Sequence, residues 1–247
     1  SDLGVVRRTD ILKINPNFEL KFWPKKGKIQ RHSFSVTPIS IWRPELGYEN
    51  SDYTIYSRWQ ANFQDSSQLR FEMLNKFTKL YDDFDPTRTD DAIPLPADQD
   101  YYYTSFEASY RSDQRKKVSY RVNPSFGQFF NGNKYSLETS LTLRLQPYFS
   151  GSIQMNYDKI DLPDPYPDAS IWLIGPKLDI TFTKNMFWST FFQYSTQREN
   201  FSINTRFQWR VAPLSDLFLV YNDNYATDVF GPRFRSLNLK FTYWLNI

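Results

Sequence analysis

The chain has 247 residues, of which 19% are aromatic and 23% are charged, and its net charge is +3. This length allows one large β domain or two small ones, while the low net charge argues against a nucleic-acid partner. Cysteine is absent, which excludes disulfides, thiol nucleophiles and thiolate metal sites, and no apolar run reaches the length of a membrane helix.

Most of the chain alternates between apolar and polar residues with a period of two, which is typical of β-strands. The range 135–145 shows this clearly, because Leu141 and Leu143 are separated by Thr142. The sequence predicts thirteen strands, at residues 14–23, 29–42, 53–63, 68–80, 101–111, 118–129, 135–145, 148–160, 171–183, 186–195, 201–211, 217–222 and 234–247. A weaker segment covers residues 5–12. Pro38 predicts a bulge or a change of face, and Gly175 with Pro176 predicts a bulge.

The last predicted strand has the strongest pattern. One face is apolar and holds Leu237, Leu239, Phe241, Tyr243, Leu245 and Ile247, whereas the other holds Ser236, Asn238, Lys240, Thr242 and Asn246. An apolar face opposite a polar face at the chain end is typical of the closing strand of an outer-membrane barrel.

The strand lengths and connections favour the same architecture. Strands of roughly 9–13 residues suit a tilted strand that crosses a bilayer. Tight turns, counted back from the C-terminus, fall on one side, as they do in outer-membrane barrels. We therefore expect an all-β, antiparallel up-and-down transmembrane β-barrel with about 13–14 strands in this chain. A soluble β-sandwich, with the aromatic faces buried against each other, is the alternative fold.

The number of predicted strands and the N-terminal segment both indicate that this chain is part of a longer barrel. Bacterial single-chain barrels usually have an even number of strands, so thirteen strands predict one to several missing N-terminal strands. The segment 1–4 has neither the basic start nor the apolar core of a signal peptide, so an exported protein would be processed or a fragment. We expect residues 1–247 to be a single domain and the C-terminal portion of a longer barrel.

Aromatic residues predict two girdles at the membrane interfaces. The expected periplasmic girdle contains Trp23, Tyr148, Phe149, Phe187, Trp188, Trp209, Tyr243 and Trp244. The expected external girdle contains Trp42, Tyr53, Tyr101, Tyr102, Tyr103, Phe129 and Tyr135.

Four strings resemble a known family: LGVVRRT at 3–9, FQWR at 207–210, SDLFLVYN at 215–222 and RSLNLKFTY at 235–243. They are similar to a C-terminal outer-membrane β-barrel domain of unknown function in Bacteroidota proteins. Those proteins usually carry an N-terminal carbohydrate-binding module of the family-nine type. The resemblance implies that this chain is roughly the second half of that domain. The chain lacks the module, so sugar recognition does not carry over.

Charged residues on the expected inner face are the first candidate site. They are Arg58, Arg70, Arg111, Arg121, Arg144, Arg206, Arg210, Lys240, Glu72, Glu107, Glu138, Asp158 and Asp179. They could line a charged constriction or a substrate path. A solvated or salt-bridged lumen, which every such barrel needs, is the favoured interpretation.

Two further candidates are an acidic loop and the single histidine. The loop carries Asp82, Asp83, Asp85, Asp90, Asp91, Asp98 and Asp100, whose oxygens could bind calcium, although the spacing is not that of an EF-hand. A solvated external loop is favoured. His32 would have to assist any His-dependent hydrolase, but no serine or aspartate stands out as its partner, and an ordinary strand residue is favoured.

The expected function is a membrane anchor or structural subunit of a cell-envelope assembly in the outer membrane of a Gram-negative bacterium. A passive porin-like channel is the alternative, and an outer-membrane hydrolase ranks last. We expect no catalytic, cofactor or metal site. The expected partners are outer-membrane lipid, lipopolysaccharide and other envelope proteins, with no nucleic acid.

Overall fold

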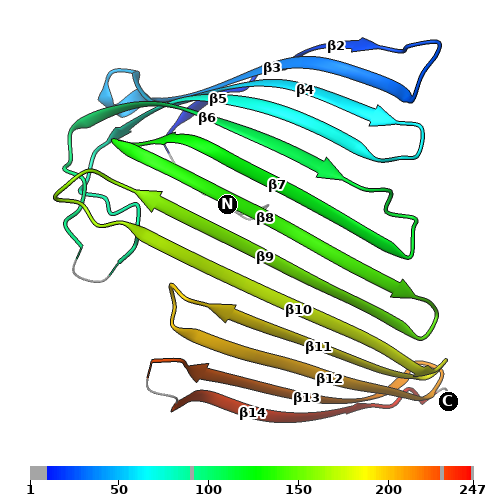
Figure 1. Ribbon diagram of the computed structural model, residues 1–247. Coiled ribbons are helices and arrows are strands. Elements are labelled where there is room, and N and C mark those ends of the chain that lie inside the picture. Colours follow the sequence, from blue (N-terminus) through cyan, green and yellow to red (C-terminus); the bar gives the residue numbers. More distant parts are fainter. Residues whose placement is uncertain (1–9, 90–91, 229–230, 246–247) are drawn as a thin grey trace. The chain divides into compact units, whose positions relative to one another are not determined.

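The computed structural model describes residues 10–89, 92–228 and 231–245 (Figure 1). Within these ranges the chain forms fourteen β-strands, one short 3-10 turn, η1 (Pro44–Leu46), and no α-helix. The strands are β1 (Leu12–Ile14), β2 (Phe18–Phe22), β3 (Ile29–Arg43), β4 (Glu49–Phe63), β5 (Gln68–Leu80), β6 (Gln99–Arg111), β7 (Val118–Phe129), β8 (Gly132–Leu145), β9 (Phe149–Asp161), β10 (Ala169–Thr183), β11 (Met186–Ser195), β12 (Asn200–Ala212), β13 (Ser215–Ala226) and β14 (Gly231–Thr242). None of the described segments is a helix with the length and apolarity to cross a membrane.

The strands follow one another in an up-and-down order, β1-β3-β4 and so on to β14, with β2 also paired to β3. Pairing is antiparallel, as between β3 and β4 and between β13 and β14. The predicted all-β, antiparallel up-and-down fold is therefore confirmed. The β-sandwich alternative is wrong, because the described strands form one sheet rather than two.

β1 and β2 lie on β3 in the same register, as if they were one strand interrupted at residues 15–17. Leu12 pairs with Trp42 in β1, and Phe18 pairs with Val36 in β2. The predicted strand 14–23 therefore corresponds to β2 and shares only Ile14 with β1, and the fourteen strands occupy thirteen positions across the sheet.

Two prolines explain this interruption. In the shared register Pro16 falls opposite Pro38, and neither has an N–H to donate to a ladder. The Thr37 hydroxyl instead donates to Asn17 Oδ1 at 2.6 Å. On its other side, Pro38 pairs with Ile55 without a register shift, so the bulge predicted at Pro38 is wrong.

Several strand bounds differ from the prediction. β4 begins at Glu49 and β13 continues to Ala226, both beyond the predicted ends. β14 ends at Thr242, so Tyr243 and Leu245 follow the strand, and the Tyr243 ring stacks on Phe241 at 6.2 Å. The weak segment 5–12 lies mostly outside the described residues.

The bulge predicted at Gly175 and Pro176 is also absent from the pairing with β11. Ile174 pairs with Tyr194 and Lys177 pairs with Phe191 in one continuous register. The register shift of this pair lies further along, between Thr181 and Thr183.

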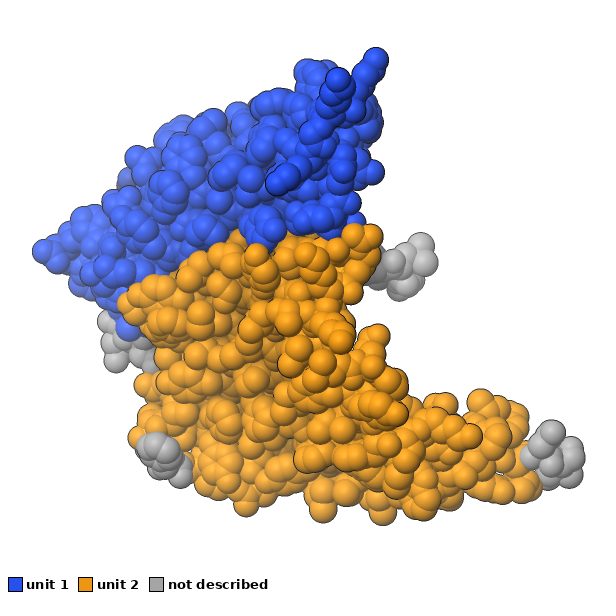
Figure 2. Space-filling model, turned by 45° about the vertical axis from the view of Figure 1, so that its right-hand side comes forward, with its two compact units in different colours: residues 1–110, 123–136, 159–169 blue, residues 111–122, 137–158, 170–247 orange. Residues whose placement is uncertain are grey.

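The chain divides into two compact units, shown in different colours in Figure 2. Unit 1 consists of residues 1–110, 123–136 and 159–169, and unit 2 of residues 111–122, 137–158 and 170–247. Unit 1 contains β1–β5, and unit 2 contains β11–β14. Each is described separately below.

Each unit has an apolar face and a polar face, because side chains alternate along every strand. In unit 1, Phe34, Trp59 and Phe71 are register partners on the apolar face of β3, β4 and β5. One residue along, Ser35 and Arg58 pair on the polar face. Unit 2 repeats the arrangement across β11–β14.

The apolar faces are largely exposed. Leu237 and Leu239 of β14, for example, expose 67% and 69% of their surface. The fully buried side chains of the described residues are instead few and mostly small or polar, such as Ser51, Ser119 and Ser215. Within the described residues, each unit therefore buries few large apolar side chains.

Candidate functional site

Arginine–glutamate pairs dominate the polar face of unit 1. Arg58 Nε donates to Glu72 Oε2 between β4 and β5, and Arg70 donates to Glu107 between β5 and β6. The Glu72 side chain is only 5% exposed. These four residues belong to the predicted inner-face set, and the structure brings them together as mutually neutralised pairs.

The polar face of unit 2 distributes its charges differently. Asp179 of β10 accepts a hydrogen bond from Ser189 at 2.6 Å and pairs with Lys177 at 3.0 Å. Asp216 accepts from Gln208 at 3.1 Å and from Arg210 at 3.4 Å.

Arg206 of β12 lies between these two acidic groups, with Ser189 as its register partner on β11. Its guanidinium makes no hydrogen bond or ion pair with residues of the described ranges. Arg206 also borders a pocket of about 340 Å³ on this face. The remaining lining residues are Asp179, Ile180, Thr181, Phe187, Trp188, Ser189, Gln208 and Arg210.

Side-chain amides continue the polar face towards the chain end. Asn204 donates to Asn222, and Asn222 donates to Ser236 Oγ at 3.2 Å. Asn238 also donates to Ser236, at 3.3 Å. This row of amides links β12, β13 and β14. The alternation of the sequence does not predict which of these side chains bond to each other, because the register of the strands determines it.

A second polar pocket, of about 300 Å³, lies nearer the other end of β10 and β11. Among its lining residues are Asn156, Asp158, Gln193, Arg198 and Asn200. It includes Asp158 of the predicted set. Arg144, also of that set, donates to Ser119 Oγ at 2.9 Å and to the Gln114 carbonyl at 3.1 Å.

The described parts of the acidic loop, residues 82–89 and 92–100, contain their own hydrogen bonds and a buried apolar side chain. Phe84 and Leu95 form an isolated backbone bridge, and Leu95 is fully buried. Asp85 accepts hydrogen bonds from the Thr87 and Thr89 amides, each at 2.8 Å. The carboxylate thus stabilises the turn.

No group of three or more acidic, histidine or cysteine side chains in the described ranges is placed to hold a metal ion. Asp90 and Asp91 of the predicted calcium alternative lie outside those ranges. Aromatic contacts fix the loop instead, because the rings of Phe84 and Phe130 are 5.4 Å apart. Phe130 also packs on Tyr103 at 5.4 Å.

His32 lies on the apolar face of β3 among aromatic rings. Its ring stacks on Phe22 at 5.1 Å and lies 6.5 Å from Trp59. Its register partner on β4 is Ala61. Its Nδ1 is buried and makes no hydrogen bond with the described residues.

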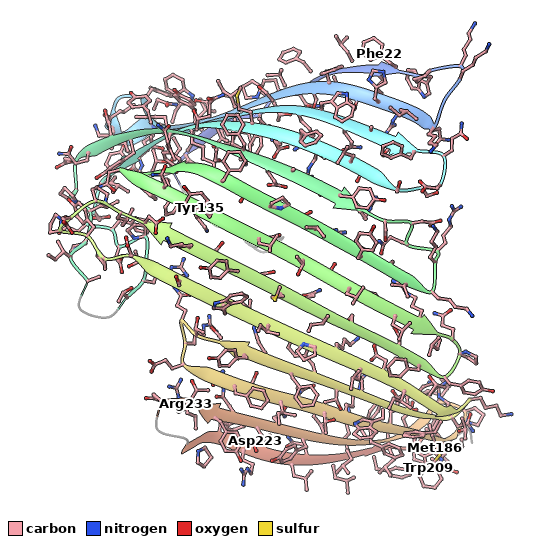
Figure 3. All side chains as sticks on the ribbon, viewed as in Figure 1. Phe22, Tyr135, Met186, Trp209, Asp223 and Arg233 are labelled. Atoms are coloured by element: carbon pink, nitrogen blue, oxygen red, sulfur yellow. The ribbon has the colours of Figure 1, made fainter. Side chains whose placement is uncertain are left out.

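The alternation of apolar and polar residues did not predict one charged cluster, which lies where β13 and β14 approach their connection. Asp223 pairs with Arg235 at 3.0 Å and accepts a hydrogen bond from the Tyr221 hydroxyl. Its side chain is 3% exposed and lies on the apolar face, in register with Ile203. In Figure 3, Asp223 and Arg233 lie towards the opposite end of the unit 2 strands from Met186 and Trp209.

Two of the predicted girdle residues face the other way. Phe187 borders the Arg206 pocket on the polar face, and Tyr103 is buried against Phe129 and Phe130. Other members are exposed as expected, such as Trp209, whose register partner is Met186 (Figure 3). The period of two cannot distinguish an interfacial ring from an inner ring near the end of a strand.

The connection between β6 and β7, residues 112–117, holds a local ion pair. Hydrogen bonds from Arg115 lower the pKa of Asp113 to about 2, below its usual value of 3.8. The Arg115 Nε and the Asp113 Oδ1 are 2.9 Å apart. In the loop after β5, burial raises the pKa of Tyr81, whose hydroxyl donates to Glu49 at 3.2 Å.

The polar faces of the two units therefore differ in their charges. In unit 1 arginines form ion pairs with glutamates, whereas in unit 2 Arg206 forms no ion pair with the described residues.

No protein-family model, no curated protein and no solved structure matches the chain.

Proposed function

We propose that the chain is part of an outer-membrane β-barrel that acts as a membrane anchor or structural subunit of a cell-envelope assembly. One observation carries this proposal: each unit has an extended apolar face that is exposed and a polar face that is hydrogen-bonded. Such a sheet suits a wall between lipid and water, since lipid would cover the apolar face.

The apolar face of unit 1 also offers room for lipid chains. A groove of about 390 Å³ runs between the rings of Phe34, Trp59, Phe71 and Phe106. Exposed Trp and Tyr near strand ends, such as Trp188 and Tyr148, suit the interfacial region. We therefore propose outer-membrane lipid and lipopolysaccharide as the surrounding partners, in a Gram-negative bacterium.

Strand polarity supports a larger barrel. Thirteen antiparallel positions leave the β1–β2 position and β14 running in the same direction, so an all-antiparallel closure needs an odd number of further strands. β14 pairs with β13 alone among the described strands. The resemblance to the Bacteroidota barrel domain supports the same proposal.

The paired charges of unit 1 favour the anchor or subunit role over a conduit, because Arg58 and Arg70 are already neutralised by glutamates. A passive channel is the second candidate. The pocket beside Arg206 favours it, because the Arg206 guanidinium could bind a solute that passes through the channel.

Single-cysteine labelling tests the membrane proposal, because the chain has no native cysteine. Leu239→Cys places a polarity-sensitive fluorophore on the apolar face of β14, and Asn238→Cys places it on the polar face, one residue away. In outer-membrane vesicles we expect blue-shifted emission, quenched by lipid-soluble nitroxides, for position 239 only. Aqueous emission at both positions would contradict the proposal.

Native extraction in mild detergent then separates the two roles. Co-migration with other envelope proteins, without conductance in planar bilayers, supports the subunit role. A lone species with stable ion conductance supports the channel.

A further inference from the structure

We propose that the Arg206 pocket of unit 2 binds small organic carboxylates that have an aromatic or apolar body. The argument rests on three features of this pocket: a guanidinium that makes no hydrogen bond with the described residues, neighbouring acids that have other hydrogen-bond partners, and a ring beside it.

The guanidinium keeps its hydrogen-bond donors free of the described residues, because the nearby acids bond to other groups, although its charge interacts with that of Asp179. Asp179 is held by Lys177 and Ser189, and Asp216 by Gln208 and Arg210. A guanidinium presents a fork of N–H donors that matches a carboxylate in a bidentate pair.

The charge around the pocket has the right sign for an anion. Lys177, Arg206 and Arg210 are cationic, whereas Asp179 and Asp216 are anionic, so one positive charge is in excess. Because the cations lie on one face of neighbouring strands, the local potential favours a small anion over a cation.

Phe187 supplies the apolar contact. It faces the polar side of β11 and pairs in register with Gln208, which makes it a diagonal neighbour of Arg206 across β11 and β12. A planar body could pack on this ring while its carboxylate reaches Arg206, and the Gln208 amide lies alongside. The volume of about 340 Å³ suits a ligand of the size of benzoate rather than an oligomer.

The site does not depend on membrane insertion, so binding is measured on the full-length protein in detergent. Benzoate is the probe, with acetate as the anion without a ring and benzyl alcohol as the ring without a charge. Titration calorimetry at constant ionic strength should give saturable benzoate binding with a dissociation constant on the order of 1 mM. Acetate should bind at least several-fold more weakly, and benzyl alcohol should not saturate.

Two variants locate the site and a third is the matched control. Arg206→Gln should weaken benzoate binding at least tenfold, and Phe187→Leu should reduce the preference for benzoate over acetate. Arg121→Gln removes an arginine of β7, outside the pocket, and should leave binding unchanged. Arg206→Lys keeps the charge but loses the fork, and should bind with intermediate affinity.

Three outcomes would overturn the proposal. They are wild-type protein without saturable benzoate binding, equal losses in Arg206→Gln and Arg121→Gln, and undiminished binding in a folded Arg206→Gln protein. Near-UV circular dichroism confirms that each variant is folded. Failure of this site leaves the labelling test of the membrane proposal unaffected, because that test concerns the other face of the sheet.

Discussion

The polar faces of the two units bond their charged side chains in different ways. Unit 1 neutralises its arginines with glutamates on the adjacent strand, as Arg58 does with Glu72. Unit 2 uses amides and hydroxyls for much of its cross-strand bonding, and its Arg206 makes no hydrogen bond or ion pair with the described residues. The first arrangement bonds charged side chains of neighbouring strands to each other, whereas the second leaves a guanidinium without a hydrogen bond to the described residues.

The difference also suggests where substitutions should matter. Removing one member of a buried pair leaves an uncompensated charge, while removing a solvated charge leaves nothing behind. Stability should therefore be sensitive to the polar face of unit 1, and ligand binding to that of unit 2.

The largest expected effect concerns backbone packing in unit 1. Gly127 has a φ of +148°, and a Cβ there would lie 2.5 Å from the Ser105 Cα and the Thr104 carbonyl oxygen. Gly127→Ala should lower the free energy of unfolding by about 3 kcal/mol. Guanidinium unfolding in detergent, followed by tryptophan fluorescence, measures it. The control is Gly175→Ala in unit 2, where the nearest atom is 3.4 Å away, on Phe191, and little change is expected.

The next effect tests the comparison directly with two identical substitutions. Arg58→Gln leaves the Glu72 carboxylate nearly buried without its partner and should cost about 2 kcal/mol, reduced from the fully buried case because Arg58 is one-third exposed. Arg206→Gln should change stability by less than about 0.5 kcal/mol. Chemical unfolding of both variants gives the difference. Equal costs would show that the paired and unpaired arginines are equivalent, contrary to the comparison.

The smallest effect extends the comparison to a charge pair in a connection. The pKa of Asp113 is about 2 in the folded protein, below its usual 3.8, so the folded state binds fewer protons between these values. The contribution of Asp113 to stability is present above about pH 4 and is lost as the pH falls through 2. Asp113→Asn should therefore flatten the decline in stability between pH 4 and pH 2. Unfolding curves across this range measure the slope, and an unchanged slope in the variant would mean that Asp113 is not responsible.

Much of the fold could be predicted from the sequence, because apolar and polar residues alternate along each strand that has one apolar face. Residues 68–80, 118–129 and 186–195 have the same bounds in β5, β7 and β11 as predicted. At other strand ends, polar residues made the predicted strand shorter than the observed one. Asp223 and Asn224 suggest a turn, yet both remain in the ladder with β12 because neighbouring strands supply their backbone partners.

The candidate site was less predictable. The sequence identified Arg58, Glu72 and Arg206 as inner-face charges, but only register decides that the first two are paired and that the third lies opposite Ser189. Phe187 was assigned to an interface from its place near a strand end, whereas its parity along β11 turns it towards Arg206. Local pattern therefore predicts which residues share a face, and pairing determines their chemistry.

The interruption between β1 and β2 has a consequence for assembly. A polypeptide that adds to this edge would find no continuous row of donors and acceptors at residues 15–17, where Pro16 has no N–H. Stray copies of the sheet could stack on it only through two short ladders. The break should therefore weaken edge-to-edge pairing along this side of the sheet.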